Sequence, residues 1–239
     1  MIQQPAITVP SGDSQFHMLH LVRGRHFSPF KMYIRRDLHL AVMLNPKVGS
    51  TPFRRLLREG LKEAGIKPTL SRLWPIRLTR RYMTAPPYDF LDVLLRPGHY
   101  KFHCFVRNPY ARFLSAWKDK FTLTDDGKPA ARSMKRELGV VRKFAARNGL
   151  SGAKDGGPMP LETFLAYVAA QREGRRNQHW DTQTSVLACD AIAYDHIWQM
   201  ETNFVAGMVN ILTQLGLDED WVRQTLETPR NPSRKLSEP

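Results

Sequence analysis

The sequence predicts an α/β fold in three layers, with helices on both faces of a parallel sheet. Two short apolar runs, residues 40–44 and 102–106, have the composition of strands buried on both faces. Each run is followed by a turn and then by a helical pattern. Strands that alternate with helices in this way favour a parallel sheet, whose ligands bind beyond the carboxyl ends of the strands.

The turn after the first run has the chemistry of an anion site. Asn45-Pro46 ends the strand, and a helix is expected over residues 53–64. A loop that enters a helix presents backbone N–H groups and the positive end of the helix dipole. In the Walker pattern the lysine follows the glycine, but here it comes first. An ordinary turn with a capping hydroxyl is the alternative for this segment alone. The residues expected to bind the anion are Lys47, Val48, Gly49, Ser50, Thr51 and Pro52.

The turn after the second run offers a second anion site. Arg107 stands at the carboxyl end of the strand, and Ser115 falls in the second turn of a helix expected over residues 110–121. A guanidinium donates two hydrogen bonds to phosphate oxygens, so Arg107 and Ser115 could converge on one phosphate. Taken alone, the pair could equally be a capping arginine and a packed serine. Two such sites in one chain indicate a ligand with two separate phosphate groups.

Together the two segments resemble the nucleotide-binding elements of sulfotransferases that use 3′-phosphoadenosine 5′-phosphosulfate (PAPS). Residues 46–51 resemble the 5′-phosphosulfate loop, and residues 106–121 resemble the 3′-phosphate element. The likeness is closest to the chondroitin- and HNK-type (family 2) carbohydrate sulfotransferases, whose loop typically reads Pro-Lys-Val-x-Cys-Thr-Asn-Trp-Lys-Arg. Here Ser50 replaces the cysteine, and Pro52-Phe53 replaces Asn-Trp.

A third segment extends the resemblance. Residues 179–183 and 187–189, followed by Tyr194-Asp195, are similar to that family's His-Trp-x-x-Gln, Leu-Cys-x-x-Cys and Tyr-Asp run. The match continues through Glu201-Thr202. One cysteine of the family pair is absent, because position 188 is alanine.

The resemblance implies a P-loop-like, sulfotransferase-like fold and transfer of a sulfuryl group from PAPS to a hydroxyl of a carbohydrate or glycolipid, with no metal. Lys47 would stabilise charge on the bridging oxygen, the loop would hold the 5′-phosphate, and Arg107 with Ser115 would hold the 3′-phosphate. His179 is the leading general base because it is the titratable group inside the third segment, with a purely structural imidazole as the alternative. We expect activity to rise with pH through the imidazole range. Further candidates for the base are His103, Asp195 and Glu201.

The charge distribution favours an anionic ligand. The chain carries a formal net charge of +14, and residues 1–120 hold 21 Lys+Arg against 7 Asp+Glu, whereas residues 121–239 hold 15 of each. Two other functions would also account for a positively charged half of the chain. A Mg²⁺-dependent, kinase-like nucleotide enzyme would need a Walker loop and a partner acid, and neither is evident. A nucleic-acid binder using the basic half would lack the usual zinc-finger or aromatic motifs, so we expect no nucleic-acid partner.

The organisation expected is a basic arm over residues 1–35 and a single domain over 36–239. The two cysteines are expected to be reduced, without a disulfide or a metal site. No stretch reaches membrane-span length, and the first 20 residues lack a signal-peptide core. We therefore expect a cytoplasmic, bacterial enzyme without the membrane anchor of animal members, with peripheral membrane contact through the basic half left open. Other elements expected are helices over 131–148, 160–171 and 202–215 and after residue 218, a strand over 192–198, and an irregular segment over 66–90.

Overall fold

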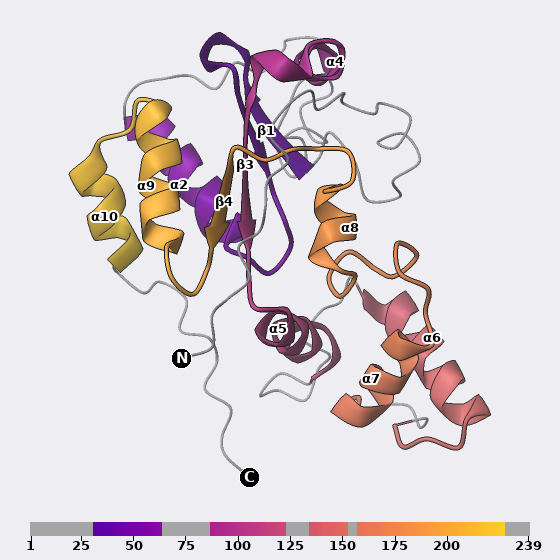
Figure 1. Ribbon diagram of the computed structural model, residues 1–239. Helices are drawn as coiled ribbons and strands as arrows, with labels where there is room; N and C mark the ends of the chain where they lie inside the picture. Colours follow the sequence, from indigo (N-terminus) through magenta and orange to yellow (C-terminus); the bar gives the residue numbers. More distant parts are fainter. Residues whose placement is uncertain (1–30, 64–86, 123–133, 153–156, 228–239) are drawn as a thin grey trace, which may run out of the picture.

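A computed structural model describes residues 31–63, 87–122, 134–152 and 157–227 (Figure 1). A four-stranded sheet in the order β1-β2-β3-β4 forms its centre. β2, β3 and β4 run parallel, as the sequence predicts, whereas β1 runs antiparallel to β2. The strands are β1 (Met32–Arg35), β2 (Leu40–Met43), β3 (Lys101–Val106) and β4 (His196–Gln199).

The position of β1 corrects the predicted boundary between arm and domain. Residues 32–35 pair with β2, so they belong to the sheet rather than to the basic arm. The chain reverses through the short 3₁₀ turn η2 (Arg36–Leu38) and through His39, whose φ of 48° is left-handed. A reversal of only four residues can join antiparallel strands but not parallel ones. Residues 1–30 of the predicted arm lie outside the described residues.

Most of the predicted helices are present within a few residues of their expected bounds. Of the segment over 66–90 that was predicted to be irregular, residues 87–90 belong to α4. The prolines of this segment argue against a helix, but Pro87 is the first helical residue, where its missing N–H costs nothing. Residues 64–86 lie outside the described part. The short helix α8 was also not predicted. The helices are α2 (Ser50–Glu63), α4 (Pro87–Leu95), α5 (Pro109–Phe121), α6 (Lys135–Arg147), α7 (Leu161–Ala169), α8 (Gln183–Leu187), α9 (Phe204–Gln214) and α10 (Glu219–Glu227), with a 3₁₀ turn η3 (Pro97–His99) before β3.

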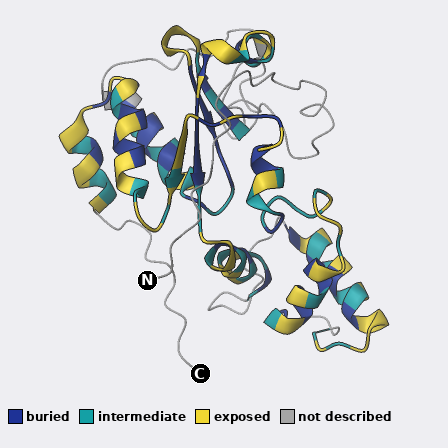
Figure 2. Ribbon diagram, in the orientation of Figure 1, coloured by how far each residue is buried: buried dark blue, intermediate teal, exposed yellow. Residues whose placement is uncertain are grey.

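Helices cover both faces of the sheet, which confirms the three-layer prediction (Figures 1 and 2). Successive strand residues point to opposite faces. Leu40, Val42 and Phe105 pack in a cluster with α2, α9 and α10. Ala41 and Phe102, which point to the opposite face, pack in a second cluster with α4 and the α8 region.

A third apolar cluster lies apart from the sheet. It joins the end of α5 to the α6–α7 pair through Phe121, Phe164 and Trp180. The rings of Phe121 and Phe164 lie 4.5 Å apart, and those of Phe164 and Trp180 lie 5.2 Å apart. Figure 1 shows α6 and α7 side by side, away from the sheet and below α8. Among the helices of the described ranges, none combines the length and the apolar character that a bilayer crossing requires.

Candidate active site

The loop between β2 and α2 is tightly constrained. Lys47 and Gly49 both have left-handed backbones, with φ of 68° and 84°. A Cβ on Gly49 would lie 2.3 Å from Phe204 Cε2, so α9 leaves room only for glycine. Val48 is buried in the first cluster and anchors the loop. The chain therefore passes close against α9 before α2 begins.

α2 begins directly behind this loop. Phe53 N–H donates to the Gly49 carbonyl at 3.0 Å, which closes the first helical hydrogen bond. The N–H groups of Ser50 and Thr51 consequently precede the first bonded N–H and point out of the helix end. Pro52 is the third helical residue and has no N–H, so it contributes a fixed φ rather than a donor.

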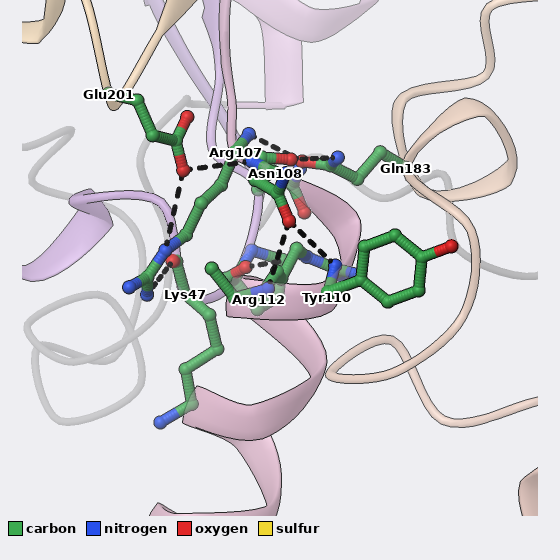
Figure 3. A network of polar contacts seen from close by, with 10 residues as sticks. Lys47, Arg107, Asn108, Tyr110, Arg112, Gln183 and Glu201 are labelled. Carbon is green, nitrogen blue, oxygen red and sulfur yellow. Dashed lines mark hydrogen bonds and ion pairs between the residues drawn. The ribbon is translucent and has the colours of Figure 1, made fainter.

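The second predicted turn is tied to the first. Arg107 follows β3, and its Nη1 donates to the Lys47 carbonyl at 3.3 Å (Figure 3). Gln183 at the start of α8 contacts both strand ends. Its Oε1 accepts from Arg107 N–H at 2.9 Å and from Asn45 Nδ2 at 3.0 Å, and its Nε2 donates to the Arg107 carbonyl at 2.6 Å. These hydrogen bonds hold the two turns that the sequence predicts to bind anions next to each other.

Asn108 and Glu201 shape the start of α5. Asn108 Oδ1 accepts from the N–H groups of Tyr110 and Ala111 at 3.0 and 3.1 Å and caps the helix. Glu201 Oε1 accepts from Asn108 N–H at 2.9 Å and lies 3.9 Å from Arg107 Nε. Glu201 therefore organises this turn (Figure 3).

Ser115 lies in the second turn of α5 and is half-buried. It precedes Asp119 by four residues, so the two share a helix face. Asp119 forms an ion pair with the Lys47 ammonium. The face that carries Ser115 therefore borders the loop between β2 and α2.

Arg112 lies in the interior, although an arginine on a helix is ordinarily found at the surface. It is 3% exposed. Its Nε donates to the Pro46 carbonyl at 3.1 Å, Nη1 to the Asp181 carbonyl at 2.7 Å, and Nη2 to the Gln178 carbonyl at 2.6 Å. Burial lowers its pKa to about 10, although Asp181 counteracts this. One guanidinium thus fastens the anion loop to the third motif.

His179 is held in the tautomer that a general base needs. Its Nδ1 lies 2.7 Å from Asn177 Oδ1, and because an amide oxygen only accepts, Nδ1 carries the proton and Nε2 keeps a lone pair. Burial lowers the pKa of His179 to about 4, and the charges of Lys120 and Lys47 contribute to this lowering. The imidazole is therefore neutral at pH 7 and lies within electrostatic reach of Lys47.

The other two candidate bases have structural roles. His103 is 1% exposed within β3, and its Nδ1 accepts from Trp198 Nε1 at 3.4 Å. Asp195 Oδ2 accepts from Phe102 N–H at 2.7 Å, and Asp195 N–H donates to the Phe102 carbonyl at 2.9 Å, which extends the β3–β4 pairing. His103 is thus shielded from solvent, and Asp195 contacts the beginning of β3 rather than the turns that follow the strands.

The Lys47 side chain ends among other charged groups. Asp119 Oδ2 contacts Lys47 Nζ and also Lys120 Nζ, the latter at 2.9 Å. Burial lowers the pKa of Lys47, while Asp119 partly restores it. Sequence reasoning assigned no role to Asp119 or to Gln183, although both lie inside the segments that carry the resemblance. Within the four described ranges, no group of three or more His, Cys, Asp or Glu side chains is placed to hold a metal.

A basic groove adjoins His179. It has a volume of about 630 Å³ and lies between α6, α7 and the chain that leads to Trp180. Asn177 connects the two places, since its Oδ1 accepts from His179 and its Nδ2 donates to Glu137 Oε1 at 3.1 Å. The groove lining includes four cationic side chains and one carboxylate, namely Lys31, Arg136, Arg175, Arg176 and Glu137.

Comparison with known proteins places this chain among the sulfotransferases. The sequence pattern of the sulfotransferase family matches residues 31–237. Carbohydrate sulfotransferase 11 of Rattus norvegicus is 27% identical over 176 residues, 72% of this chain and 49% of its own length. Carbohydrate sulfotransferase 14 of Danio rerio is 28% identical over 161 residues, 65% and 40% of the two chains. Carbohydrate sulfotransferase 14 of Homo sapiens is 30% identical over 110 residues, which cover 46% of this chain and 27% of its own length.

The chain spans about half or less of the length of these relatives. No solved structure matches it. The resemblance to carbohydrate sulfotransferases is nevertheless shared by relatives of two kinds, and the family pattern covers most of the chain. This chain therefore belongs to the sulfotransferase family.

Proposed function

We propose that the protein transfers a sulfuryl group from PAPS to a hydroxyl group of a carbohydrate or glycoconjugate. The observation that supports this most strongly is that one site combines the Lys47 loop, the Arg107 turn and a neutral His179. The first two offer donors for two separate phosphates, and the third offers a lone pair for an acceptor proton. A cytoplasmic, bacterial setting remains a prediction attached to this proposal.

In the proposed reaction the acceptor oxygen forms a bond to sulfur while the bond from sulfur to the bridging oxygen breaks. The electron pair of that bond passes to the phosphate of the leaving nucleotide. The acceptor proton goes to Nε2 of His179. Lys47 and the N–H groups of Ser50 and Thr51 offset the charge that grows on the phosphate oxygens, while Arg107 and Ser115 hold the 3′-phosphate.

The groove beside His179 is the proposed place for the rest of the acceptor. Its arginines and side-chain amides provide the donors that sugar hydroxyl and carboxylate groups accept from. The link through Asn177 places the groove next to the imidazole. An acceptor lying in the groove would present one of its hydroxyl groups to His179.

A thermal-shift experiment separates this function from its rivals. Adenosine 3′,5′-bisphosphate should raise the melting temperature without Mg²⁺, because ligand binding to the native state stabilises it. A shift only with ATP and Mg²⁺ would instead support a kinase-like enzyme. A shift only with oligonucleotides, strongly reduced by salt, would support a nucleic-acid binder. Transfer of labelled sulfate from PAPS to a panel of saccharides would then identify the acceptor.

Arg107→Ala tests the assignment of the 3′-phosphate. One charge-assisted hydrogen bond is worth roughly 1.5–3 kcal/mol, so affinity for adenosine 3′,5′-bisphosphate should fall about 10- to 100-fold. The loss should be much smaller for adenosine 5′-phosphate, and Arg223→Ala on the outer face of α10 should leave both affinities unchanged. Equal losses for the two nucleotides, measured by calorimetry, would remove Arg107 from the 3′-phosphate site.

A further inference from the structure

The proposed donor site already contains a negative charge of its own. A single oxygen of Asp119 contacts the ammonium groups of both Lys47 and Lys120. The side chains of the two lysines are 17% and 15% exposed, whereas that of Asp119 is 46% exposed. The carboxylate thus lies on the solvent side of two largely covered cations, where an incoming anion would have to meet it.

The backbone around Lys47 is fixed, so the movable part of this arrangement is its side chain. The Lys47 carbonyl accepts from Arg107 Nη1, and Val48 is buried in the core. Figure 3 shows the Lys47 side chain extending away from the Arg107 turn and along α5. An ammonium on a flexible four-carbon stem can exchange one oxygen partner for another without moving the loop.

The surrounding charges keep Asp119 an anion in this state. Although burial raises it, the hydrogen bonds from Lys47 and Lys120 leave the pKa of Asp119 below its ordinary value. Asp119 is therefore ionised at neutral pH. It presents to both lysines the same kind of oxygen that a phosphate or sulfonate would present.

We propose that Asp119 is a positioning residue that competes with the phosphosulfate group for Lys47 and Lys120. Without donor, it holds the two ammonium groups together at the mouth of the loop. When donor binds, the lysines exchange the carboxylate for oxygens of the donor. After transfer, the carboxylate takes them back and speeds departure of the nucleotide product. This inference rests on the proposed function, and it adds a residue that weakens ground-state binding in order to permit release.

Asp119→Asn is the direct test, because it keeps the shape of the side chain and removes its charge. By calorimetry at pH 7, the affinity for adenosine 3′,5′-bisphosphate should rise about tenfold, which corresponds to about 1.4 kcal/mol. Stopped-flow dissociation of the nucleotide should slow by a similar factor. Asp119→Glu, which keeps the charge, should bind the nucleotide like the wild type.

A pH series supplies a readout that a purely structural role would not change. Asp119 supports the protonated form of Lys47, which burial opposes. Without the carboxylate, Lys47 should lose its proton at lower pH, so nucleotide affinity should begin to fall at lower pH in Asp119→Asn than in the wild type. Such a shift would tie the carboxylate to Lys47 itself.

Glu219→Gln is the matched control. It changes the net charge by the same amount but lies on α10, where Glu219 pairs with Arg223. Nucleotide affinity should stay within twofold of the wild type. If Asp119→Asn folds poorly, Asp119→Ser provides a second neutral variant with the same expected gain. Unchanged or weaker binding by a folded neutral variant would overturn the role of Asp119 alone, whereas a wild-type protein that binds no nucleotide would overturn the proposed function as well.

Discussion

Lys47 combines a left-handed backbone with an ammonium in an ion pair, and the two features belong to different tasks. The backbone shapes the loop, and its left-handed conformation is as unfavourable for alanine as for lysine. The ammonium alone supplies charge. A substitution that removes the side chain therefore tests chemistry more than folding.

Lys47→Ala should reduce turnover by ~10²–10³ while the melting temperature stays near that of the wild type. The reason is the loss of one preorganised donor at the place where charge develops. Lys62→Ala, at an exposed position in the last turn of α2, controls for the loss of a positive charge. The measurement is transfer of labelled sulfate, and near wild-type turnover in Lys47→Ala would show that the ammonium does not stabilise the leaving group.

His179→Ala should lower kcat by about 10²–10⁴ and leave nucleotide affinity nearly constant, as expected when a general base is removed. The pKa of about 4 also changes the pH profile expected from the sequence. A base must be unprotonated, so wild-type kcat should be flat across the neutral range and fall only as the pH drops through about 4. If His179 were structural, the mutant would instead melt earlier, and its activity would decline in step with its folded fraction.

Among the secondary-structure elements, Gly49 and Gly139 offer two glycine positions whose substitution should have opposite effects on stability. A Cβ at Gly49, where φ is +84°, would lie 2.3 Å from Phe204, whereas Gly139 lies inside α6 with nothing within 4 Å of such a Cβ. Gly49→Ala should lower the free energy of unfolding by about 1–3 kcal/mol through backbone strain and the clash with α9. Gly139→Ala should raise it by roughly 0.5–1 kcal/mol.

Urea unfolding of the two variants checks both signs. Nucleotide binding should be lost in Gly49→Ala and retained in Gly139→Ala, because only the first glycine shapes the anion loop. A Gly49→Ala protein as stable as the wild type would mean that Phe204 can move aside and that the loop is less constrained than its contacts indicate.

The elements show how far the sequence could predict this fold and site. β2, β3 and the helices that follow them were predictable, because apolar runs and helical periodicity report burial directly. The antiparallel β1 was not, because residues 32–35 are followed by charged residues and their partner strand is defined only by tertiary pairing. Local chemistry predicted an anion-binding role for residues 47–52 and for Arg107, and this role stays a prediction.

Long-range partners account for most of what was missed at the site. Arg112 was expected at the surface because arginine usually is, but three carbonyls 66–69 residues away satisfy it in the interior. Gln183 stood inside a quoted motif, yet its hydrogen bonds to Arg107 span 76 positions. Nothing in the local pattern of either residue identifies such partners.

For the whole molecule, the buried imidazole of His103 and the half-buried imidazole of His179 link stability to pH. Burial lowers the pKa of His103 to about 4 and that of His179 to about 4, below the ordinary value of 6.5. The native state therefore binds fewer protons than the unfolded chain in this interval. Their contribution to stability is present above about pH 6.5 and is lost as the pH falls toward about 4.

The free energy of unfolding, measured with urea across this interval, should fall by up to about 1.4 kcal/mol per pH unit for each such group. His103→Gln should remove one group's share of the slope, whereas His39→Gln, at an exposed position, should leave the slope unchanged. An identical slope in wild type and His103→Gln would show that His103 is not buried in its neutral form.

The separate third cluster has a consequence for how this protein could diversify. The two clusters on the sheet support the proposed donor site, whereas most of the groove lining belongs to α6, α7 and the chain before Trp180, which share the third cluster. Arg112 reaches from α5 to the loop after β2 and to the chain before Trp180, and Phe121 of α5 packs in the third cluster. A lineage, or an engineer, could therefore exchange the helical unit for another and inherit a new acceptor preference while the donor machinery is passed on intact.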